Sequence, residues 1–167
     1  MNAAAQIGDD NLQRKAQDPA SVLAYWQQLP GADKQNVTLA SSAARSLMTA
    51  GRHDDAKNII EQTLAKEWDA SLVHLYGECR SADLIKQVEW ADTQLKQNPN
   101  DADLLLALGK FCTDLQLWGK AQNYLDASLA IEPKRETHLA MTRLLEKSGK
   151  PEDAARHNRK SFYSDSE

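Results

Sequence analysis

Basic side chains recur at one position of successive repeat units, and this is the pattern in the sequence with the clearest chemical use. Arg45, Lys110 and Arg143 occupy that position in three units, and Glu78 occupies it in the unit after the first. Cations at regular heights along one surface could bind the carboxylates of an extended or helical peptide. The alternative is that they are solvated charges, partly paired with Glu78 and Asp114.

Further side chains are expected on the same surface. In proteins built from stacked two-helix hairpins, the first helix of each hairpin lines a concave groove. The set does not match the Lys/Asn clamp that holds acidic C-terminal tails, so we do not expect that specificity. A peptide-binding groove is the leading interpretation. The candidate partner-binding residues are Arg45, Met48, His74, Glu78, Leu106, Lys110, Thr113, Asp114, Arg143 and Lys147.

Histidine spacing gives little support for a metal site. His74 and Glu78 lie one helical turn apart and could share a face for metal or haem-iron ligation, but no second His or Cys pair has ligand spacing. His74 is therefore interpreted as a groove-lining residue, and His53 and His157 are expected to be exposed. The sequence has no nucleophile elbow, phosphate-binding glycine loop or HExxH motif. We predict no catalytic residue, no resident metal and no enzymatic activity.

The element that positions these side chains is a helix hairpin, most clearly encoded in residues 102–135. Leu108-Gly109, Ala121 and Pro133 have the spacing of a tetratricopeptide (TPR) repeat. Gly109 and Ala121 are small, so the two helices can approach closely where they cross. Pro133 cannot continue the second helix, so it ends the unit.

The rest of the chain repeats this pattern with less regularity. We predict an all-α, right-handed TPR-like α-solenoid of about four to five helical hairpins, in which stacking completes the core of each unit. A helix over residues 1–17 and a second that ends before Pro30 would form the opening pair. The predicted divisions are a degenerate N-terminal pair (1–35), four repeats (36–68, 69–101, 102–134 and 135–163) and a frayed tail (164–167).

Composition excludes several classes of function. The 167-residue chain has a formal net charge of −4 and no long Lys/Arg cluster, so nucleic-acid binding is disfavoured. It has no apolar run long enough to span a bilayer and no signal-peptide pattern at its N-terminus. Cys79 and Cys112 do not make a disulfide framework and are expected to be buried apolar fillers.

Three segments together resemble a particular family. The blocks VLAYWQQLP (22–30), KEWDASLVHLYGEC (66–79) and LLLALGKFCTDLQLWGKAQNYLDASLAIEP (104–133) are similar to the C-terminal TPR region of HemY-type proteins of proteobacterial haem biosynthesis. The resemblance implies an inner-membrane protein with an N-terminal anchor, a soluble TPR region and a link to late steps of protohaem formation. This chain shows no anchor, so we expect either the soluble region of such a protein, with the cytoplasmic side favoured, or a departure from the family at this point.

Two hypotheses of different classes follow. The leading one is a non-catalytic scaffold that binds other proteins, including haem-biosynthetic enzymes, and needs no cofactor. The alternative is a carrier that binds haem or another porphyrin directly, with the groove cations meeting its propionates. Self-association through the terminal helices is a third option, and the sequence does not determine the oligomeric state.

Overall fold

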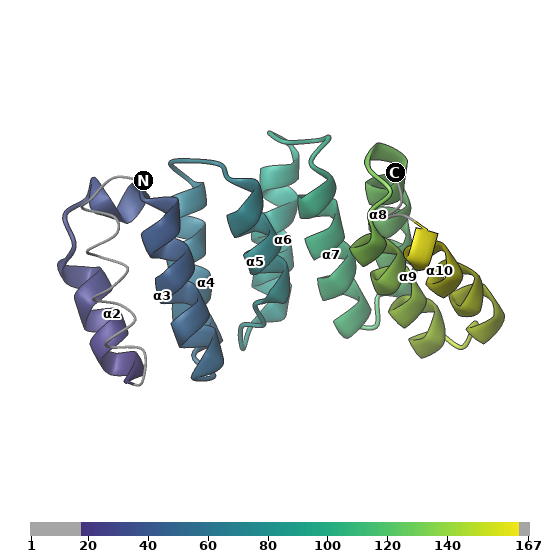
Figure 1. The fold of residues 1–167 in the computed structure, drawn as a ribbon, viewed down its shortest axis with the longest axis horizontal. Helices are drawn as coiled ribbons and strands as arrows, with labels where there is room; N and C mark the ends of the chain where they lie inside the picture. Colours follow the sequence, from purple (N-terminus) through teal and green to yellow (C-terminus); the bar gives the residue numbers. More distant parts are fainter. Residues whose placement is uncertain (1–17, 164–167) are drawn as a thin grey trace. The chain divides into compact units, whose positions relative to one another are not determined.

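The computed structural model describes residues 18–163, and all regular structure within this range is helical (Figure 1). The predicted helix over residues 1–17 and the predicted frayed tail at 164–167 lie outside the described residues. None of the described helices has the length and apolar character needed to cross a membrane. The elements are α2 (Pro19–Gln28), the short 3-10 helix η1 (Asp33–Gln35), α3 (Val37–Thr49), α4 (His53–Leu64), α5 (Ala70–Glu78), α6 (Leu84–Leu95), α7 (Ala102–Asp114), α8 (Trp118–Ile131), α9 (Arg135–Lys147) and α10 (Pro151–Tyr163).

Local sequence signals explain where many of these helices begin. The residue before the helix is Asp or Asn in five cases, and its side-chain oxygen accepts a hydrogen bond from a backbone N–H of the first turn at 2.9–3.2 Å. Such caps satisfy N–H groups that have no partner inside the helix. The five capping residues are Asp18, Asn36, Asp69, Asp83 and Asp101.

The chain divides into two compact units, and each is described by itself. The boundary falls between Ala82 and Asp83, inside the predicted 69–101 repeat. The first helix of that repeat, α5, therefore belongs to the first unit, and its second helix, α6, belongs to the second unit.

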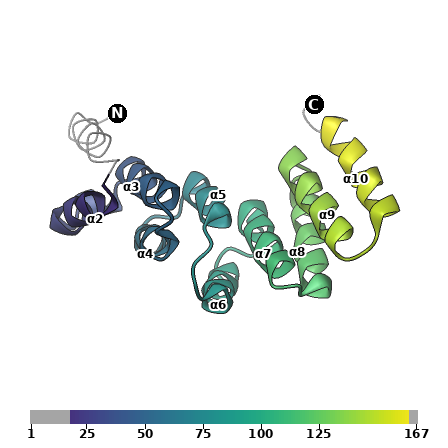
Figure 2. The same cartoon turned by 90° about the horizontal axis from the view of Figure 1, so that it is seen from below.

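The first unit is built on close packing between α3 and α4, which lie side by side in both views (Figures 1 and 2). Ala40, Ala43 and Ala44 on α3 are fully buried, and their small size lets α4 approach closely. Trp26 of α2 is 3% exposed and belongs to the core of this unit.

The second unit is centred on the α7–α8 hairpin, against which α6 and α9 also pack. A Cβ atom built on Gly109 would lie 2.4 Å from Leu125 Cδ2 and 3.5 Å from the carbonyl oxygen of Ala121. The predicted close approach at Gly109 and Ala121 is thus confirmed. At the other end of the hairpin, the buried Ser128 hydroxyl donates a 2.8 Å hydrogen bond to the Ala102 carbonyl.

Three hairpin turns share one backbone conformation. Gly51, Gln116 and Gly149 have φ values of 78°, 60° and 82°, and in each turn the next residue donates its N–H to a carbonyl near the helix end. Glycine adopts this left-handed region without a steric penalty, whereas other L-residues do not. Gln116 therefore holds a strained backbone at the α7–α8 turn.

Substituting Gln116→Gly is expected to raise the free energy of unfolding by about 1 kcal/mol, because the strain is removed and the turn is otherwise unchanged. Urea denaturation followed by circular dichroism measures this change. The matched control is Gly149→Gln, which places the same side chain in the equivalent turn and should have the opposite sign. A Gln116→Gly chain less stable than the parent would contradict the assignment of strain.

Candidate partner-binding surface

The candidate surface of the second unit is a face formed by both α7 and α9. Ion pairs between the two helices run along the length of this face. Helical spacing brings these side chains to one side of each helix. We call this surface the α7–α9 face. It consists of Asp103, Lys110, Asp114, Lys134, Glu136, Leu139, Arg143, Glu146 and Lys147.

The ion pairs connect the two helices at three levels. Lys134 Nζ lies 2.9 Å from Asp103 Oδ1, at the start of both helices. Lys110 Nζ lies 2.6 Å from Glu136 Oε1 in the next level. At the far ends, Asp114 Oδ1 lies 3.2 Å from Arg143 Nη2 and 3.6 Å from Lys147 Nζ. Each cation named here thus has a carboxylate partner on this face.

This pairing corrects the interpretation of the basic residues as an open cationic ladder. The Lys110 side chain is only 17% exposed and is bonded to Glu136. Arg143 is more exposed but is shared with Asp114, as the alternative interpretation proposed. Arg45 is exposed on α3 and belongs to the first unit. In the second unit, the two basic residues of the series, Lys110 and Arg143, are therefore locally neutralised.

Two residues predicted to line the groove are buried instead. Leu106 and Thr113 are each 3% exposed, and the Thr113 hydroxyl donates a 2.8 Å hydrogen bond to the Gly109 carbonyl. The physical reason is that α7 packs against α6, α8 and α9, so little of its circumference remains for solvent. These two side chains stabilise the hairpin and offer little surface to a partner.

The remaining predicted residues lie in the first unit. Met48 is half-buried on α3, whereas His74 and Glu78 are exposed, one turn apart on α5. The helices α3 and α5 are in contact, so these side chains belong to neighbouring elements of one unit.

The expectation that His53 is exposed is wrong, because His53 is half-buried and hydrogen-bonds to the segment that follows α5. Its Nδ1 accepts a 3.1 Å hydrogen bond from the Arg80 N–H, and its carbonyl accepts one from the Cys79 thiol. Burial raises the pKa of Cys79 to about 12, so its thiol stays protonated near neutral pH. Cys79 and Cys112 are both buried and unbridged, as predicted for apolar fillers.

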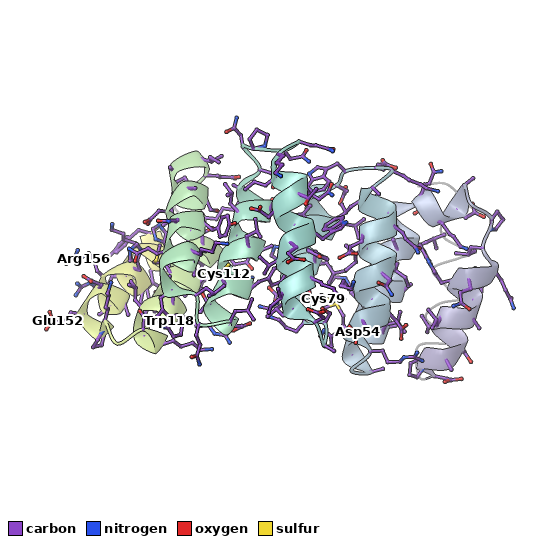
Figure 3. All side chains as sticks on the ribbon, turned by 180° about the vertical axis from the view of Figure 1, so that it is seen from behind. Asp54, Cys79, Cys112, Trp118, Glu152 and Arg156 are labelled. Atoms are coloured by element: carbon purple, nitrogen blue, oxygen red, sulfur yellow. The ribbon has the colours of Figure 1, made fainter. Side chains whose placement is uncertain are left out.

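A cleft of about 400 Å³ opens at the end of the α7–α9 face. Asp114 and Lys147 line it together with Thr113, Gln116 and Trp118. Trp118, labelled in Figure 3, stands at the first position of α8. At this end of the α7–α9 face, the aromatic side chain of Trp118 and the strained turn at Gln116 thus lie beside the paired charges of Asp114 and Lys147.

A histidine pair between α9 and α10 is a feature that sequence reasoning missed. The Nδ1 atoms of His138 and His157 are 3.2 Å apart, and the ring centroids are 5.5 Å apart. His138 is buried and His157 is half-buried, which corrects the expectation that His157 is exposed. Burial lowers the pKa of both side chains, and the nearby positive charge of Lys160 acts in the same direction. No motif joins two residues 19 apart; only the register of the hairpin brings them together.

Comparison with known proteins identifies the fold. Neither a family model nor a curated protein matches the chain. The solved structure of MamA AMB-1 is 20% identical and covers 99% of both chains with a TM-score of 0.59. A second MamA crystal structure is 17% identical, covers 99% of this chain and 96% of its own, and has a TM-score of 0.61. TTC0263, a thermophilic TPR protein of Thermus thermophilus, is 17% identical over 93% of this chain and 91% of its own, with a TM-score of 0.65.

These similarities, at low identity, concern the fold. They confirm the predicted all-α, TPR-like α-solenoid class. They do not confirm the resemblance to HemY-type proteins, which stays a prediction.

Proposed function

We propose that this chain is a non-catalytic TPR scaffold that binds a segment of another protein on the α7–α9 face. One observation carries the proposal: Leu139 is 41% exposed in the middle of α9, on a face otherwise made of charged side chains. Protein interfaces commonly combine a central apolar contact with a polar rim. Leu139 would supply the first, and the ion pairs would supply the second.

The charges of the α7–α9 face indicate which kind of partner segment would fit it. Four acidic and four basic side chains balance each other around Leu139. A balanced rim favours a segment with both signs of charge, such as one face of an amphipathic helix, over a purely acidic tail. The acidic side chains are Asp103, Asp114, Glu136 and Glu146, and the basic ones are Lys110, Lys134, Arg143 and Lys147.

The resemblance to HemY-type proteins suggests a more specific partner. On that basis we propose that the scaffold holds enzymes of late haem biosynthesis together at the bacterial inner membrane, on its cytoplasmic side. The similarity of the three sequence blocks supports this finer assignment.

Direct binding of haem or porphyrin is the alternative, and the geometry gives it less support. The propionates of a porphyrin would have to compete with Glu136 for Lys110 and with Asp114 for Arg143. A titration with haem that leaves the Soret band unchanged, or changes it equally in parent and His74→Ala chains, would remove this alternative.

The test of the scaffold proposal uses two exposed apolar residues as a matched pair. Leu139 is 41% exposed on α9, and Ile131 is 43% exposed at the end of α8. We expect Leu139→Ser to reduce crosslinking-based recovery of partner proteins at least tenfold and Ile131→Ser to leave it unchanged. Exposed substitutions of this kind change stability by only about 0.5 kcal/mol, so lost recovery would report binding. Equal recovery by both variants, or crosslinks that fall outside the α7–α9 face, would reject this surface.

A further inference from the structure

The histidine pair between α9 and α10 has no part in the proposed partner-binding face. We propose that His138 and His157 form a binding site for one divalent first-row transition ion of the Zn²⁺ class. The site would ligate the ion through the two Nδ1 atoms and complete its coordination shell with water.

The separation of the two nitrogens suits a shared ion. Zn–N bonds are about 2.0–2.1 Å long. For an ion bonded equally to two nitrogens 3.2 Å apart, the N–Zn–N angle is therefore about 100°. That angle is near the tetrahedral value that Zn²⁺ prefers. Imidazole nitrogen also suits Cu²⁺ and Ni²⁺, whereas Mg²⁺ and Ca²⁺ require oxygen ligands.

Without an ion the two rings meet nearly head to head, as an N–H···N hydrogen bond requires. The ring centroids lie 5.5 Å apart and the ring planes are tilted by 34°. Ion binding therefore needs a rotation that turns both lone pairs toward one point, and the half-buried His157 has more freedom for it than the buried His138. The Nδ1 proton of the donor ring moves through solvent to its Nε2, so both rings stay neutral and no net proton is released.

The surroundings hold the ligands in place and keep them in the state that binds metal. The Thr142 hydroxyl, one turn after His138, contacts the His138 carbonyl at 2.9 Å and the Ala154 carbonyl of α10 at 3.4 Å. Metal ligation requires unprotonated imidazole, and burial of both rings favours that neutral form. The charged side chains that act on the pair are Lys160, Arg156, Asp126 and Asp153.

The experiment is a calorimetric titration of the full chain with Zn²⁺ at pH 7.5, in the His74→Gln background. This background removes an exposed histidine of α5 that could bind Zn²⁺ by itself. We expect saturable one-to-one binding, no response to Mg²⁺, and at least tenfold weaker Zn²⁺ binding after the additional change His157→Gln. Absence of saturable binding in the His74→Gln chain, or equal binding after His157→Gln, would overturn the proposal.

A measurement on the parent chain keeps the test independent of how well the variants fold. Nitrogen-15 spectra of the imidazole rings distinguish a metal-bound Nδ1 from a protonated one. We expect Zn²⁺ to shift the Nδ1 signals of both His138 and His157. A spectrum in which those two signals do not respond to Zn²⁺ would leave only the hydrogen-bonded pair and reject the site.

Discussion

Replacing Gly109 by alanine is expected to lower the free energy of unfolding of the chain by about 1–3 kcal/mol. The added Cβ atom would lie 2.4 Å from Leu125 Cδ2 and 2.6 Å from Leu125 Cγ. Leu125 is fully buried, so its side chain cannot move into open space to relieve the overlap. The helices α7 and α8 would have to separate, and contacts along the whole hairpin would weaken. Urea denaturation of the parent and the variant measures the loss.

A double-mutant cycle tests whether Leu125 is the cause. Leu125→Ala alone should lower stability by about 2–5 kcal/mol through the cavity that it leaves. In that background Gly109→Ala should be nearly neutral, because the new methyl group enters vacated space. Gly119→Ala is the matched control: its Cβ would meet nothing within 4 Å. If Gly109→Ala and Gly119→Ala had equal effects, the close approach of the two helices would be wrong.

The features predicted correctly from the sequence depend on residues that are near one another in the chain. Pro133 is predicted to end the second helix of its hairpin, and α8 does end at Ile131, just before it. The small residues Gly109 and Ala121 belong to one hairpin, in which a short turn joins α7 and α8. The repeat pattern therefore encodes the hairpins well, and the all-helical fold follows from them.

The parts that could not be predicted depend on how one hairpin meets the next. Lys110 pairs with Glu136, which lies 26 residues further on. The register between α7 and α9 determines this partner. Repeat numbering assigns Leu106 and Thr113 to a groove, but it does not give the number of helices that cover α7. The His138–His157 contact lies within one hairpin, but it also depends on the register between two helices, α9 and α10, which no sequence motif specifies.

The other large effect is expected for Leu108→Ala, which should lower the free energy of unfolding by about 2–5 kcal/mol. Leu108 is fully buried in α7, next to Gly109. Removing most of the side chain there leaves a cavity that the surrounding helices can fill only in part. A loss below about 1 kcal/mol would mean that the α7 core collapses around the substitution and is less tightly packed than its burial indicates.

Comparison of Leu108→Ala with Leu139→Ala separates stability from recognition. Leu139 is 41% exposed on α9, so truncating it removes little buried surface and should change stability by only about 0.5 kcal/mol. The same periodic pattern of leucines in the sequence thus contains two kinds of residue, one that holds the helices together and one that remains available to a partner. A scaffold requires this combination, because a rigid hairpin must present its apolar contact without burying it. If Leu139→Ala destabilised the chain as strongly as Leu108→Ala, Leu139 would be a core residue, and the α7–α9 face would lose its apolar centre.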